Sequence, residues 1–160
     1  MNRLLPGVAH LQNIHPLFVH FPIALLSAAA LFYFLSLIFA ASDSLEWTAL
    51  WMLVLGAAGA MLSLATGLYA SGGVMVAPSV RTALLDHHRN LMIATSVIAG
   101  LLTLWAIVAR PMPARGRYVF LLGLLVMLVL MTKGADYGGR LVFDYNAAGN
   151  ACSQPIDFTQ

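Results

Sequence analysis

The chain has 160 residues, of which 61% are hydrophobic and only 9% are charged. Soluble domains carry roughly 25% charged residues, so this composition excludes a water-soluble globule and requires that most apolar surface faces lipid. The net charge of +2 is too small and its basic residues are too scattered for nucleic-acid binding. We therefore expect an all-α integral membrane protein with a single transmembrane domain.

Four apolar stretches follow one another along the chain, each long enough for a hydrocarbon core that takes about 20 helical residues. The strict alternation that a membrane barrel requires is absent from them. We expect spans over about residues 15–41, 46–70, 86–109 and 118–132. The sequence thus predicts an integral membrane four-helix bundle, followed by a short extramembrane tail over residues 135–160.

The second expected span carries small residues along one side, which is the pattern of close helix packing in lipid. These residues are Gly56, Gly59, Ala60, Ser63 and Gly67. Plain packing between helices is the favoured interpretation. The alternative is that this face joins the chain to other subunits of a larger membrane complex.

The loop between the third and fourth spans concentrates Arg110, Arg115 and Arg117 in a short turn. Basic residues in short loops favour the cytoplasmic side of a membrane. Both termini and the middle loop then lie outside, which is the periplasm in a bacterium with two membranes. Basic residues are also present on that side, but they are spread over longer segments.

All the histidines fall on the side that holds the termini, at or near the starts of the first and third spans. They are His10, His15, His20, His87 and His88. On a straight helix, His15 and His20 point about 140° apart and differ by about 7.5 Å in depth, so they cannot serve one metal. Two histidines of one helix are therefore expected to face two histidines of another.

Imidazoles that face each other from two helices are the usual way to hold haem iron by two axial ligands. We expect His20 and His88 to be the axial pair of a haem b, with His15 and His87 holding a second haem or lying beside the first. Haem propionates require cationic partners, which this side offers in Arg81, Arg89 and Arg140. The alternative is that these histidines are ordinary interfacial residues, which is the favoured explanation for His10.

The stretch from His15 to Leu25, HPLFVHFPIAL, resembles the opening of a bacterial family of membrane proteins known as domain of unknown function 2231. The resemblance continues in Thr66-Gly67, in His88 and in the piece GGRLVF over residues 138–143, so that it covers nearly the whole chain. It implies a four-span bundle. Some relatives are joined to cytochrome c-type domains, which implies electron transfer on the outer face. A histidine-glycine pair that often follows the last piece in the family is replaced here by NAAG at residues 146–149.

We therefore expect a b-type haem protein or electron-transfer subunit of the bacterial inner membrane, whose partners are lipid and either quinol or a periplasmic cytochrome c. The chain has no CxxCH motif, so a covalently attached haem is not expected. Two other functions are considered. One is a structural or assembly subunit of a larger respiratory or photosynthetic complex. The other is a transition-metal carrier that uses the same histidines with Asp86. Whether any reaction is catalysed is left open.

Overall fold

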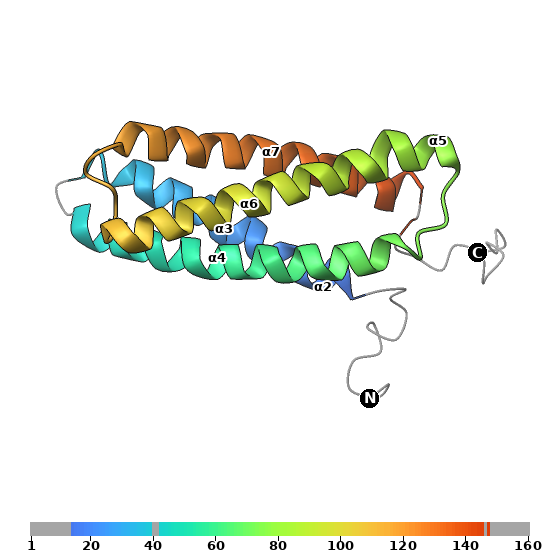
Figure 1. The fold of residues 1–160 in the computed structure, drawn as a ribbon, viewed down its shortest axis with the longest axis horizontal. Coiled ribbons are helices and arrows are strands. Elements are labelled where there is room, and N and C mark those ends of the chain that lie inside the picture. The colour runs from blue at the N-terminus through green and yellow to red at the C-terminus, as the bar shows by residue number, and fades with distance from the viewer. Residues whose placement is uncertain (1–13, 40–41, 146, 148–160) are drawn as a thin grey trace, which may run out of the picture.

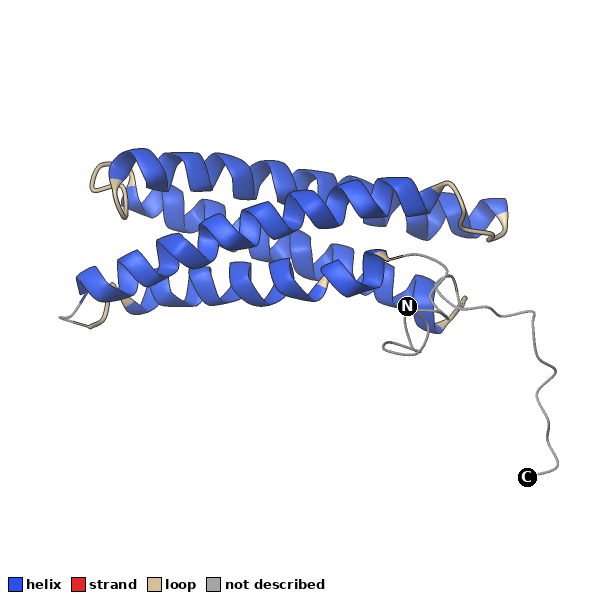
Figure 2. Ribbon diagram, turned by 90° about the horizontal axis from the view of Figure 1, so that it is seen from below, coloured by secondary structure: helices blue, strands red, loops and turns tan. Residues whose placement is uncertain are grey.

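The computed structural model describes residues 14–39, 42–145 and 147, and every regular element within these residues is helical. The elements are α2 (His15–Phe18), α3 (His20–Leu35), α4 (Ser42–Ser71), α5 (Pro78–Val80), the π-helical turn η1 (Arg81–Leu85), α6 (Asp86–Ala109) and α7 (Arg117–Phe143). They make four rods that run lengthwise beside one another (Figures 1 and 2). The first rod joins α2 to α3, and the third joins α5 and η1 to α6. Each rod is long and apolar enough to cross a membrane, which confirms the expected four-helix membrane bundle.

The rods end at different residues from the expected spans. The first helix stops at Leu35 instead of continuing to residue 41. The third rod already begins at Pro78, because proline in the first helical turn sacrifices no hydrogen bond. The fourth helix continues to Phe143, so residues 135–143 of the expected tail are helical. Leu141 is buried in this extension against residues of η1, and this packing extends both rods at the same end.

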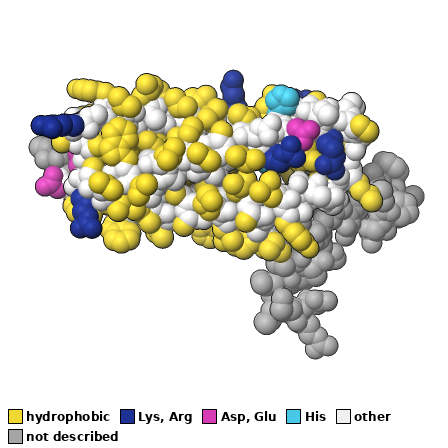
Figure 3. Space-filling model, in the orientation of Figure 1, with side chains coloured by type: hydrophobic (Ala, Val, Ile, Leu, Met, Phe, Trp, Pro, Cys, Tyr) yellow, Lys and Arg dark blue, Asp and Glu magenta, His cyan; other side chains and the backbone are white. Residues whose placement is uncertain are grey.

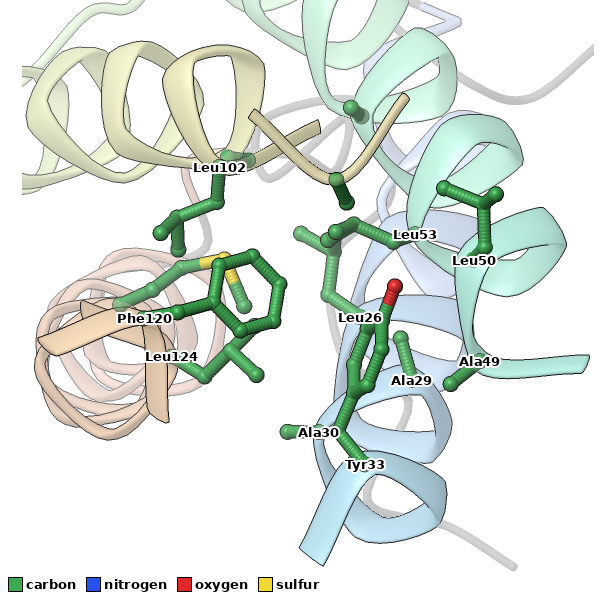
Figure 4. Packing of buried hydrophobic residues seen from close by; sticks show 14 of the residues in the cluster. Leu26, Ala29, Ala30, Tyr33, Ala49, Leu50, Leu53, Leu102, Phe120 and Leu124 are labelled. Carbon is green, nitrogen blue, oxygen red and sulfur yellow. The ribbon is translucent and has the colours of Figure 1, made fainter. Parts of the chain in front are cut away.

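The centre of the bundle is filled by large apolar side chains from all four rods (Figure 4). The rings of Tyr33 and Phe120 meet edge to face, with centroids 5.0 Å apart. The hydroxyl of Tyr33 donates a hydrogen bond of 2.9 Å to the carbonyl of Pro111. A buried tyrosine needs such a partner, and this one ties the first rod to the loop between α6 and α7.

The small-residue side of α4 packs against the first rod of the same chain. A Cβ atom added at Gly56 would come within 2.8 Å of the Leu26 side chain, and one added at Gly59 would lie 3.4 Å from Pro22. Small residues allow this close approach of two backbones in lipid. The packing interpretation is thus confirmed, and the surface is covered inside the chain instead of being offered to another subunit.

The outside of the bundle has the charge distribution of a membrane protein. Apolar side chains cover the middle of the face seen in Figure 3, and charged side chains gather mainly towards its two ends. Large apolar side chains such as Phe21, Trp51 and Leu104 are well exposed. Since a continuous apolar surface of this kind is excluded for a soluble monomer, lipid must cover it.

Candidate functional site

Two histidines from different rods meet at the end of the bundle where the third and fourth rods are extended. The rings of His15 and His88 have centroids 6.4 Å apart and planes inclined by 75°, and both residues are half-buried. The sequence predicts that His20 pairs with His88 and His15 with His87, and neither of these pairs shows a ring contact within the described part of the chain. The fifth histidine, His10, lies outside the described residues.

The pairing differs because the first rod is not a straight helix at this point. α2 ends at Phe18, a turn at Val19 follows, and α3 begins at His20. The exposed His20 ring has its Nδ1 3.1 Å from the carbonyl oxygen of Pro16 in α2, although His20 also lines the cavity described below. His15 is left as the residue of this rod that reaches across to the third rod.

The ring of His15 is oriented by Thr66 of α4, whose Oγ1 lies 3.2 Å from Nδ1. The hydroxyl of Thr66 donates its single proton to the carbonyl of Ser63 over 2.9 Å. It can therefore only accept from the imidazole, so Nδ1 of His15 carries the hydrogen. The lone pair of this neutral ring consequently belongs to Nε2.

His88 is oriented in the same way from α7. Its Nδ1 lies 2.7 Å from the carbonyl oxygen of Gly134, and a carbonyl oxygen can only accept. Nδ1 of His88 therefore donates as well, and Nε2 carries the lone pair. Metal-binding histidines typically have this arrangement, with one nitrogen held by the protein and the other able to bind the metal.

Each of the two rings lies against the backbone of a neighbouring helix at a glycine. A Cβ atom at Gly67 would be 2.9 Å from Cε1 of His15, and one at Gly138 would be 2.8 Å from Cε1 of His88. A larger residue at either position would displace the ring. The sequence had not predicted this role, although both glycines belong to the segments that carry the family resemblance.

A cavity of about 400 Å³ extends from the histidine pair into the bundle and is lined by residues of all four rods. Its size lies within the range of roughly 300–1,000 Å³ that is usual for small-molecule sites. Most of the wall is apolar, with Leu26, Met92 and Met131 among the lining residues. The site therefore suits a large, mainly apolar ligand that reaches both imidazoles.

Only one of the three candidate propionate partners lines this cavity. Arg89 does so, and it also forms an ion pair of 3.0 Å with Asp86. Arg140 is exposed, is not among the lining residues and pairs with Asp144 over 3.4 Å. Arg81 donates to the carbonyl of Val74 over 2.9 Å, so it secures the connection after α4.

His87 has a separate environment on the surface. Its Nδ1 lies 3.1 Å from the carbonyl oxygen of Thr82, and its ring packs on Tyr137 with centroids 5.5 Å apart. Asp86, which a metal carrier was expected to use, makes its ion pair with Arg89. Within residues 14–39, 42–145 and 147, no three His, Cys, Asp or Glu residues are grouped so as to hold a metal ion.

The family model described as "Predicted membrane protein (DUF2231)" matches residues 11–150. Neither the search of curated proteins nor that of solved structures found a match. The segments noted for their resemblance to this family come together around the cavity, since they supply His15, Thr66, Gly67, His88 and Gly138.

Proposed function

We propose that this chain, which belongs to the DUF2231 family of predicted membrane proteins, is a b-type haem protein that transfers electrons and uses His15 and His88 as axial ligands. The meeting of these two rings carries the proposal. A metal–nitrogen bond is about 2 Å long, and the ring centre lies about 1 Å further on, so imidazoles on opposite sides of one ion have centres about 6 Å apart. The rings of His15 and His88 have their centres 6.4 Å apart.

The donor set also supports haem over a bare metal ion. Zinc and similar ions take about four protein ligands in structural sites, whereas a porphyrin supplies four nitrogens and leaves two axial positions. Two imidazoles that each carry the lone pair on Nε2 match those two positions. The acceptors on Nδ1, Thr66 and the Gly134 carbonyl, increase the basicity of the ligands. Haem in such a site supplies a reversible one-electron step.

The surroundings of the pair suit the rest of the molecule. The apolar wall would enclose the macrocycle, and Arg89 at the cavity would bind a propionate by a charge-assisted hydrogen bond. The proposal is for one haem, because His15 already faces His88 while His87 packs on Tyr137. A second haem between His15 and His87 gains no support from this geometry.

The proposed location is the bacterial inner membrane, with the histidine end of the bundle in the periplasm. Support comes from Arg110 and Arg115 in the loop between α6 and α7 and from Arg117 at the start of α7, at the opposite end of the bundle, because loops with such basic residues are favoured in the cytoplasm. Electron partners would then be quinol in the bilayer or a periplasmic cytochrome c. Larger membrane subunits would bind through a surface other than the small-residue side of α4.

The test is the visible absorption spectrum of the purified protein together with four single variants. We expect a Soret band and a reduced-minus-oxidised α-band in the wild type. The His15→Ala and His88→Ala variants should lose both bands, whereas His20→Ala and His87→Ala should keep them. A colourless wild-type protein, isolated from cells that make haem, would disprove the proposal. Loss of the bands in His20→Ala alone would restore the pairing predicted from sequence.

A further inference from the structure

Three buried residues with hydroxyl groups line the cavity. They are Ser63 of α4 and Thr95 and Ser96 of α6, which are 8%, 3% and 4% exposed. Thr95 Oγ1 is buried without a hydrogen-bond partner within the described residues. The hydroxyls of Ser63 and Ser96 also form no hydrogen bond to the residues that the structure describes, but their oxygen atoms are less completely buried than Thr95 Oγ1. A buried hydroxyl without a partner is costly in an apolar setting, and this cost applies to Thr95.

Other hydroxyls of this protein are satisfied by their own helices. Thr103, also buried in α6, donates to the carbonyl of Ala99 over 2.7 Å. Ser36 donates to the carbonyl of Tyr33 over 2.8 Å, and Thr66 donates to that of Ser63. This backbone bond is the usual solution for serine and threonine in a helix. Among the buried serines and threonines of the described residues, the three that do not adopt it all line one cavity, which indicates that they serve a ligand there.

The chemistry of the inner end restricts the group that it binds. Thr95 follows His88 by seven residues in α6, which places it about 10 Å further into the bundle. Arg89 is the one Lys or Arg among the described residues that line the cavity, and it neighbours His88 in the sequence. An anionic group near Thr95 would lack a cation, and an unpaired charge is expensive at this depth. The hydroxyls therefore suit a neutral oxygen that accepts hydrogen bonds.

We infer that Ser63, Thr95 and Ser96 form a hydrogen-bonding site for the neutral carbonyl oxygen of a lipophilic ligand. Such a carbonyl has two sources in a haem-containing bundle. It belongs either to a quinone whose ring lies on the apolar wall, or to a formyl substituent on the buried edge of the macrocycle. Naming a quinone or a haem formyl group as the source rests on the proposed haem function. The inference that a hydrogen-bonding site exists rests only on the hydroxyls and the cavity.

The first arm of the test is a titration of the purified full chain, in detergent, with decyl-benzoquinone. Decylbenzene, which has the same apolar chain but no oxygen, is the control ligand. The Ser63→Ala/Thr95→Val/Ser96→Ala variant removes the three hydroxyls, and Thr103→Val is the matched control because its hydroxyl is satisfied by Ala99. We expect the quinone to bind about tenfold more weakly to the triple variant, with Thr103→Val and the binding of decylbenzene unchanged.

The second arm identifies the macrocycle by mass spectrometry after acid–acetone extraction and records the α-band of each variant. A formyl group, with an α-band that shifts in the triple variant but not in Thr103→Val, would assign the carbonyl to the haem and support the inference. Hydroxyl-dependent quinone binding to a chain without haem would also support it, while disproving the proposed function. The inference is overturned if quinone binding is absent or independent of the hydroxyls and the extracted macrocycle has no carbonyl substituent.

Discussion

The imidazole of His88 lies so close to the backbone of Gly138 that a methyl group on this glycine would be 2.8 Å from Cε1 and 3.0 Å from Nδ1. The same ring nitrogen donates to the carbonyl of Gly134, one helical turn earlier in α7. A single stretch of α7 thus supplies both the acceptor that fixes the tautomer and the space that the ring occupies. The orientation of His88 is therefore decided by α7 rather than by its own helix.

Replacement of Gly138 by alanine is expected to displace His88 and weaken the proposed haem binding by at least about tenfold, the usual effect of disturbing a ligand's supporting contacts. The measurement is haem content per protein, from the Soret absorbance. Gly100→Ala is the control, because a methyl group there would have no neighbour within 4 Å and Gly100 does not line the cavity. Equal haem content in the two variants would contradict this account of Gly138.

Thr66 is expected to act through His15. Thr66→Val keeps the shape of the side chain but removes the oxygen that accepts from Nδ1 of His15, so haem affinity should fall about 10- to 100-fold. Thr66→Ser, which keeps the hydroxyl, should restore most of the affinity. If Thr66 had only a structural role, the haem affinity of Thr66→Val and Thr66→Ser would follow their thermal stability instead of the presence of the hydroxyl. Haem titration and thermal unfolding of the same samples would reveal this.

Arg89 is expected to influence the reduction potential of the haem. It lines the cavity and carries a positive charge, which favours the reduced or less positive state of a nearby iron. Arg89→Gln should therefore lower the midpoint potential by a few tens of millivolts, as for loss of a partly screened charge. Arg140→Gln is the control, since Arg140 is exposed and pairs with Asp144. A redox titration with equal potentials for both variants would rule out this role.

The stability of the far end of the bundle is expected to depend on Tyr33. Tyr33→Phe removes the hydrogen bond to Pro111 and leaves a carbonyl without this donor, which should lower the free energy of unfolding by about 1–2 kcal/mol. Tyr118→Phe should have little effect, because Tyr118 is 82% exposed. Unfolding in detergent, followed by circular dichroism, measures both. The haem spectrum should not change, since Tyr33 is not among the residues lining the cavity.

The architecture was predictable from sequence because long apolar stretches in a chain with few charges have few other solutions. The ends of the rods were less predictable. Residues 78–85 and 133–143 mix polar residues, glycine and proline with apolar ones, so hydropathy alone gives no helix there. Packing of Leu141 against Leu84 and Leu85 makes these segments helical, and such a contact between distant residues is not visible in a hydropathy pattern.

The site was partly predictable. The gathering of histidines at the starts of two spans predicts a site at one end of the bundle, and the structure brings His15 and His88 together at that end. The ring contact of His88 with His15 was not predicted from sequence, because the direction of a ring depends on the turn at Val19 and on the acceptors Pro16 and Thr66. Gly67 and Gly138 leave space for the imidazole rings because they have no side chain. That role becomes visible only when the neighbouring rings are placed.

The length of α6 has a consequence for how electrons would reach the site. His88 and Arg110 are 22 residues apart (88 to 110), which corresponds to about 33 Å of helix against a hydrocarbon thickness of about 30 Å. If Arg110 lies among the headgroups of one leaflet, the two imidazoles lie at the interface between the hydrocarbon core and the headgroups of the opposite leaflet. A site at this depth would be accessible both to an electron carrier dissolved in the bilayer and to one dissolved in the water outside it. The described part of the chain has no large hydrophilic domain that would block either approach.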